Sequence, residues 1–228
     1  MLNPDYPKRR LAVAPASIFF VCFMALHLGA CVAPPSNYPS ARSVGKGNHV
    51  MEVAVTGIQN SDGERIAVPT FRVLYGLDEN LDVAVESVLP ATLGIGLRYS
   101  LLNPKEDGLA WAVHGGFGTN PLLLLVSSDS SYFSLGSTVS YQYGAWEPFV
   151  VARFDTVRLR LDDPNDGNAF FDLSKDIDES YSSLATGLTW WSSSDWGLYG
   201  QVSFLTGFDT EFDVLDDFPL FTVGAVFR

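Results

Sequence analysis

The chain has 228 residues, a formal net charge of −12 at pH 7, and 47% hydrophobic residues. This length is enough for one barrel or one sizeable soluble domain. The acidic charge argues against nucleic-acid binding, because contact with phosphates needs clustered lysine and arginine. The two cysteines, Cys22 and Cys31, both lie near the start. The rest of the chain therefore offers no disulfide, cysteine nucleophile or cysteine metal ligand.

Residues 1–30 have the features of an export signal. A positive cluster, Lys8–Arg10, precedes the apolar core Leu11–Leu28, and small residues follow directly before Cys31. This order resembles the signal peptide of bacterial lipoproteins. The resemblance implies cleavage before Cys31, a diacylglycerol on its sulfur, and a fatty acid such as palmitate on its new amino group. An ordinary signal peptide with a chance cysteine, or a retained helix, is the alternative.

Residues 31–48 are predicted to form a flexible tether behind the lipidated cysteine. The stretch contains Pro34, Pro35 and Pro39 together with serine and glycine. Such a composition is typical of an extended, mobile linker. Its last part, Ala41–Gly47, resembles the lead-in of outer-membrane barrel lipoproteins.

From His49 onward, apolar and polar residues alternate with period two, which predicts strands. The clearest pair is the hairpin 181–192 and 196–206, whose strands are about as long as a membrane-crossing strand must be. The apolar run 121–126 does not alternate and is predicted to be loop or a short extra piece. The ten predicted strands are 49–58, 67–76, 80–88, 91–101, 108–118, 131–143, 146–159, 181–192, 196–206 and 218–227.

Each predicted strand has one apolar face and one small or polar face. A membrane barrel turns the apolar face outward, whereas a soluble lipocalin-like barrel or a sandwich turns it inward. The charged residues of the polar face are Glu52, Arg72, Asp82, Glu86, Arg98, His114, Arg153 and Asp155.

The aromatic residues favour the membrane barrel. If successive strands alternate in direction, one group of aromatics falls at a single rim of the apolar face, where a girdle at the headgroup interface is expected. The connections at this rim are short and most at the other rim are longer, as in outer-membrane barrels. The group is Tyr75, Tyr99, Tyr143, Trp146, Trp190, Trp196 and Phe227.

Residues 49–228 resemble single-chain bacterial outer-membrane β-barrels. The resemblance rests on the hairpin strand Leu81–Glu86 and on the C-terminal strand Phe221–Phe227, which looks like an insertion signal although Arg228 follows it. It implies an all-β, antiparallel up-and-down transmembrane barrel. It also implies contact with outer-membrane lipids and insertion by the barrel-assembly machinery.

The inward charges predict a network of ion pairs rather than an open pore. Four carboxylates face three arginines in a narrow barrel, so the groups can pair and plug the lumen. A small selective pore is the alternative, but charge-selective pores usually carry one sign in excess. His114 beside Asp155 invites an acid–base interpretation. Because no partner nucleophile is evident, we predict no enzyme activity and no cofactor.

The predicted external loops are acidic, mainly within residues 160–180 and 208–217. The run Asp162–Gly167 is superficially similar to a calcium loop, but Pro164 and Leu173 stand where that loop needs ligands. Divalent cations bound between several loops are one hypothesis, and a solvated acidic face is the simpler one.

The sequence therefore predicts a lipid-anchored outer-membrane barrel with a structural or envelope role and a plugged lumen. A small passive diffusion channel is the first alternative. The second is a tethered soluble periplasmic β-barrel that binds an apolar ligand.

Overall fold

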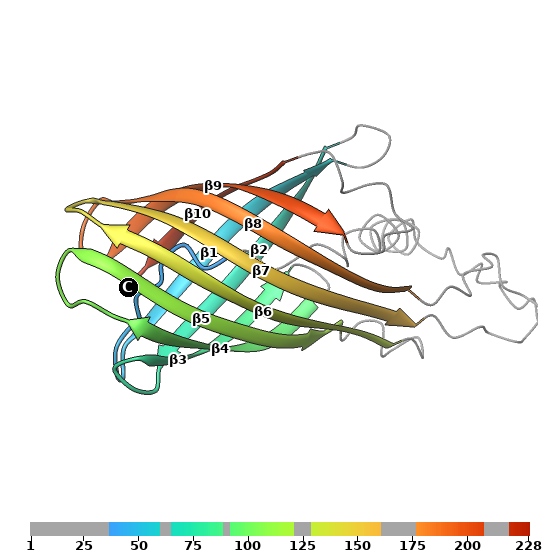
Figure 1. Ribbon diagram of the computed structural model, residues 1–228, viewed down its shortest axis with the longest axis horizontal. Coiled ribbons are helices and arrows are strands. Elements are labelled where there is room, and N and C mark those ends of the chain that lie inside the picture. The colour runs from blue at the N-terminus through green and yellow to red at the C-terminus, as the bar shows by residue number, and fades with distance from the viewer. Residues whose placement is uncertain (1–36, 60–64, 89–91, 121–128, 161–176, 208–218) are drawn as a thin grey trace, which may run out of the picture.

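The computed structural model describes residues 37–59, 65–88, 92–120, 129–160, 177–207 and 219–228. Ten antiparallel strands form one closed barrel, in which each strand pairs with its neighbours in sequence and β1 pairs with β10 (Figure 1). This confirms the predicted fold class and strand number. The strands are β1 His49–Gln59, β2 Arg65–Gly76, β3 Leu81–Val88, β4 Thr92–Leu102, β5 Gly108–Thr119, β6 Asp129–Gln142, β7 Trp146–Arg160, β8 Ile177–Trp191, β9 Trp196–Gly207 and β10 Leu220–Phe227.

The largest difference from the predicted boundaries is at β8, which begins four residues before the predicted start at 181. After Ile177, the residues Asp178, Glu179 and Ser180 are polar on both faces, so alternation gives no signal there. Pairing with β7 nevertheless continues through it, and Arg158 Nη2 lies 3.1 Å from Asp178 Oδ2. The run 121–126, predicted to be loop, lies outside the described residues.

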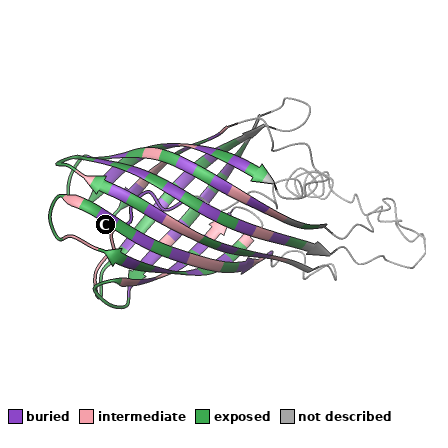
Figure 2. Cartoon of the chain, viewed as in Figure 1, coloured by how far each residue is buried: buried purple, intermediate pink, exposed green. Residues whose placement is uncertain are grey.

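Buried and exposed residues alternate along the strands (Figure 2). The apolar face points outward: Ile95, Leu97, Leu184 and Val223 expose between 54% and 65% of their surface. A continuous exposed apolar wall is what lipid contact requires and what a soluble barrel avoids. The alternative of a soluble barrel with an apolar interior is therefore wrong.

One rim of the barrel, called here the short-turn rim, carries the turns Leu77–Asn80, Asn103–Asp107, Tyr143–Ala145 and Ser192–Asp195. The outward aromatics gather at this rim. Trp146 lies 6.5 Å and Trp196 lies 6.2 Å from Trp190 between ring centroids. Trp146 pairs with Trp190, and Trp196 pairs with Phe227. The predicted gathering of aromatic residues at one rim is confirmed for these four residues.

The segment before β1 corrects the predicted tether. Residues 37–45 run inside the barrel from the short-turn rim (Figure 1). Asn37, Tyr38 and Ala41 are buried. Composition suggested a mobile linker, but short polar side chains and free backbone groups also suit a lumen lined with hydrogen-bond partners. Cys31 lies outside the described residues.

Two glycines let this lumenal segment turn into β1. Gly45 and Gly47 both have φ of 78°, a left-handed conformation that side chains rarely adopt. The turn is held by hydrogen bonds from Asn48 N to Gly45 O (3.1 Å) and from Gly47 N to Gly76 O (2.9 Å). None of the described residues forms a helix long and apolar enough to cross a membrane.

Candidate functional site

All eight charged residues singled out in the sequence face the lumen and are buried. Strand register explains why several of them meet. Glu52 lies opposite Arg72, which lies opposite Glu86 on the next strand, and Asp82 lies opposite Arg98. Directly opposite residues on paired strands have adjacent side chains, so the register brings opposite charges together.

Arg72 is the centre of the largest cluster. Its Nη1 lies 2.9 Å from Glu52 Oε2, and its Nη2 and Nε lie 3.0 and 3.1 Å from Glu86 Oε2. Two tyrosine hydroxyls bind the carboxylate oxygens that Arg72 does not contact. Tyr132 donates to Glu86 Oε1 at 2.7 Å, and Tyr199 donates to Glu52 Oε1. The cluster therefore links strands from opposite parts of the chain through the interior.

Two further pairs occupy the lumen. Arg98 Nη2 lies 2.8 Å from Asp82 Oδ2, and Arg153 Nε lies 2.7 Å from Asp155 Oδ2. His114 contacts Thr138 Oγ1 through Nε2 at 3.2 Å. Asp155 is thus bound to Arg153, while the contacts of His114 are with other groups. This arrangement gives no support to an acid–base pair of His114 and Asp155.

Tyr38 of the lumenal segment inserts its ring into the charged cluster. The Arg72 guanidinium carbon lies 4.0 Å above its centroid and that of Arg98 lies 5.4 Å away. The His114 ring centroid is 4.5 Å from that of Tyr38. An aromatic face within about 6 Å of a guanidinium attracts it electrostatically. Tyr38 therefore joins two arginines that belong to separate ion pairs.

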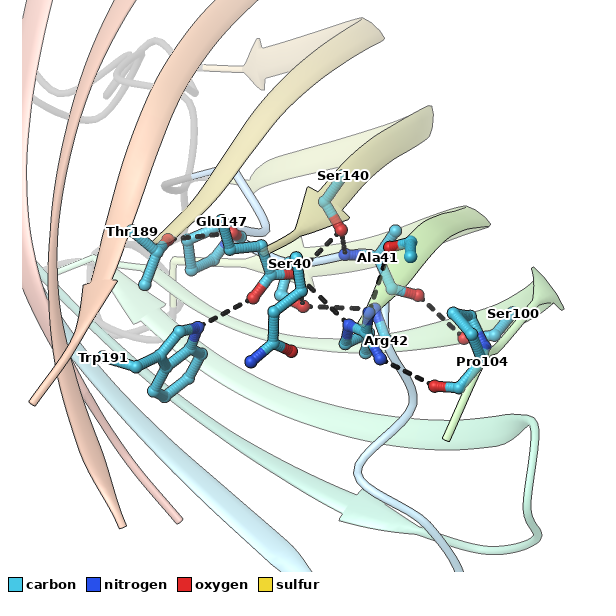
Figure 3. A network of polar contacts seen from close by, with 12 residues as sticks. Ser40, Ala41, Arg42, Ser100, Pro104, Ser140, Glu147, Thr189 and Trp191 are labelled. Atoms are coloured by element: carbon cyan, nitrogen blue, oxygen red, sulfur yellow. Dashed lines mark hydrogen bonds and ion pairs between the residues drawn. The ribbon is translucent and has the colours of Figure 1, made fainter. Parts of the chain in front are cut away.

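Glu147 on β7 anchors the next part of the segment (Figure 3). Ser40 donates to its Oε1 at 2.6 Å and Ser140 donates to the same atom at 2.8 Å. Trp191 Nε1 donates to Oε2 at 2.9 Å. Glu147 is fully buried, and three donors satisfy its charge.

The backbone of the segment is also held by the wall. Ala41 N donates to Ser140 Oγ at 3.1 Å, and Ser100 Oγ donates to Ala41 O at 2.9 Å (Figure 3). The Arg42 guanidinium donates to the carbonyls of Pro104, Glu106 and Gly108 at 2.6 to 3.0 Å. Ser43 Oγ and Val44 N both donate to Asp82 Oδ1. The segment is therefore fixed inside the lumen by hydrogen bonds to the barrel wall.

Sequence reasoning missed Tyr38, Ser40 and Glu147. Glu147 has the same parity as Arg153 and Asp155 on its strand, so the alternation pattern contained the signal for its inward position. Tyr38 and Ser40 precede the first strand and have no periodicity. Their place depends on groups up to 150 residues away, as the Thr189 to Pro39 hydrogen bond illustrates.

A cavity of about 1010 Å³ opens at the short-turn rim beside the segment. Arg42, Arg98, Trp191 and Arg228 are among its lining residues. The guanidinium carbon of Arg228 lies 3.7 Å from the Trp191 ring centroid. The C-terminal arginine therefore packs at the mouth of the lumen, and Phe227 is the outward aromatic residue that ends the strand.

No metal-binding group of three or more histidine, cysteine or acidic residues occurs within the described parts of the chain. The acidic stretches 161–176 and 208–218, which contain most of the residues of the divalent-cation hypothesis, lie outside the described residues. What the described lumen offers chemically is a set of buried charges that pair with one another, with hydroxyl groups and with an internal segment, while Asp155 Oδ1 is left without a hydrogen-bond partner.

No protein-family model matches the sequence, and a search of curated proteins found no match. Solved bacterial outer-membrane barrels are similar in structure. The N-terminal β-barrel domain of Pseudomonas aeruginosa OprF has a TM-score of 0.38 at 10% identity, covering 80% of this chain and 98% of that one. An outer membrane channel from Pseudomonas putida F1 has a TM-score of 0.49 at 11% identity, covering 84% and 99%.

Escherichia coli outer membrane protein W has a TM-score of 0.37 at 14% identity, covering 81% of this chain and 98% of that one. At such identities and TM-scores, the fold assignment rests on the strand pairing of this chain itself. The residues of the lumen network have to be interpreted from their own geometry.

Proposed function

We propose that this chain is a structural component of the bacterial outer membrane, a β-barrel whose lumen is closed by its charged network and its lumenal segment. One observation carries the proposal: Arg72, 1% exposed, binds Glu52, Glu86 and the ring of Tyr38 at once. These contacts cross the interior of the lumen, which in an open channel would contain a continuous path of water. Buried charges satisfied in this way fix one arrangement of the surrounding strands.

The exposed apolar wall and the aromatic girdle support the membrane location. By the rule that periplasmic turns are short, the short-turn rim faces the periplasm. The signal-like residues 1–30 and Cys31 support a lipid anchor in the cell envelope, with outer-membrane lipids and the barrel-assembly machinery as partners. Divalent cations bound by the acidic external loops remain part of the hypothesis.

Two measurements test the proposal. The first compares mobility of the outer-membrane fraction in SDS gels with and without boiling, where a closed membrane barrel gives a shift on heating. The second is the conductance of the purified wild-type protein in planar lipid bilayers. We expect a heat-dependent shift and no stable conductance. Equal mobility in both lanes contradicts the membrane barrel, and steady conductance contradicts the closed lumen.

A small passive diffusion channel is the second candidate function. The cavity of about 1010 Å³ at the short-turn rim favours it, because part of the lumen is already open to one side. A channel requires the opening to continue past Tyr38 and Arg72. Steady single-channel currents from the wild-type protein would support this candidate over a structural role.

A further inference from the structure

The lumen is narrowed near the short-turn rim by residues that do not belong to the barrel wall. Tyr38, Ser40 and Arg42 all come from the segment before β1, and their hydrogen bonds and ring contacts reach four strands, β2, β4, β5 and β7. The wall strands pair with one another without the segment. The barrel and the group that fills it are therefore structurally separable.

The segment leaves no space for a side chain at one glycine of the wall and little space at a second. A Cβ at Gly76 would overlap the carbonyl group of Gly45, and a Cβ at Gly96 would lie 3.1 Å from the Tyr38 hydroxyl oxygen. Both glycines face the lumen. The shape of the wall thus fits the segment, since glycines, which have no side chain, stand where the segment approaches the wall most closely.

The wall residues around the segment carry an excess of negative charge. Glu52, Asp82, Glu86 and Glu147 supply four carboxylates, whereas Arg72, Arg98 and, at the mouth of the lumen, Arg228 supply three guanidinium groups. The segment compensates in part. Its Ser40 and Ser43 donate to Glu147 and Asp82, and Arg42 Nε lies 3.8 Å from Glu147 Oε1. Withdrawing the segment would remove these partners, leaving Asp82 with Arg98, and Glu147 with Ser140 and Trp191, at the vacated part of the lumen.

We propose that residues 37–45 are the plug of a latent pore that selects small hydrophilic cations. An excess of carboxylates around a narrow aqueous path attracts cations and repels anions. This proposal rests on the closed barrel of the proposed function, and it adds a permeation activity that the segment suppresses. Glu147 and Asp82 are the residues that set the selectivity once the plug leaves.

The direct test deletes residues 37–44 from the full chain and measures conductance in planar bilayers under a KCl gradient. The heat-dependent mobility shift shows that the variant is folded. We expect stable currents absent from the wild type, with a reversal potential displaced toward that of potassium. Glu147→Gln in the deletion background should shift the reversal potential back toward zero. A synthetic peptide of residues 37–45 added at the short-turn side should reduce the current.

A point substitution tests the same proposal with the segment still attached. Gly76→Val should displace Gly45 and open the pore in part. The matched control is Gly200→Val, because Gly200 faces outward with open space around it. We expect currents from the Gly76 variant and none from the Gly200 variant.

The outcomes separate this proposal from the one on which it rests. A wild-type protein that conducts as well as the deletion variant refutes the closed barrel. A closed wild type with a folded deletion variant that is also closed, or that selects anions, refutes the latent cation pore alone. If the deletion variant does not fold, a folded Gly76→Val protein without current overturns the proposal.

Discussion

Replacing Arg72 by methionine should destabilise the barrel more than any exposed ion-pair substitution. Arg72 is 1% exposed and holds both Glu52 and Glu86 at 2.9 to 3.1 Å, so its loss leaves two buried carboxylates without their main partner. Breaking a buried pair by removing one partner costs about 3–5 kcal/mol. Loss of the guanidinium over Tyr38 adds about 0.5–2 kcal/mol. We expect a decrease of at least about 3 kcal/mol in the free energy of unfolding.

The assay is urea unfolding of the purified protein in lipid vesicles, followed by tryptophan fluorescence. The matched control is Arg158→Met, which removes the exposed pair with Asp178, whose side chains are 56% and 57% exposed. Exposed pairs contribute about 0–1 kcal/mol. The triple variant Arg72→Met, Glu52→Gln, Glu86→Gln should recover much of the loss, because it leaves no buried charge unpaired. Equal losses for Arg72→Met and Arg158→Met would refute the role assigned to the cluster.

Other consequences can be measured in the same preparations. Leu97→Arg should prevent assembly, because charge at the bilayer midplane costs about 2–4 kcal/mol, whereas Leu97→Phe should give a normal heat-dependent gel shift. Glu147→Ala should lower the free energy of unfolding by about 1–3 kcal/mol by leaving Ser40 and Trp191 Nε1 as unpaired donors, and Glu147→Gln should cost less; identical urea midpoints for the two variants would contradict this. Cys31→Ser should abolish incorporation of labelled palmitate. Label retained in this variant would contradict Cys31 as the site of lipid attachment.

The strand number, the outward apolar face and the aromatic rim could be predicted because alternation is a local property. Each of these features depends on residues two apart in sequence, and a closed barrel repeats the same rule in every strand. The same rule placed Arg72 and Asp155 inside. It did not choose their partners, since pairing also depends on register, and the expected neighbour of Asp155 was His114 rather than Arg153.

The lumenal segment could not be predicted by such a rule. Tyr38 lies where composition indicates a linker, and its position depends on Arg72, Arg98 and His114, which come from three different strands. Proline and serine are equally compatible with a mobile tether and with a bound, extended chain. Only the three-dimensional arrangement of hydrogen-bond partners distinguishes these two states.

The position of the segment inside a closed cylinder has a consequence for how the protein is assembled. The wall is hydrogen-bonded all the way round, and the seam between β1 and β10 joins the two ends of the chain. Residues 37–45 directly precede β1, so they lie beside this seam when it forms. If they bind the wall strands before the seam closes, their hydrogen bonds with the wall form as the strands assemble. We therefore expect residues 37–45 to bind the wall strands first, and β10 to pair with β1 around them afterwards.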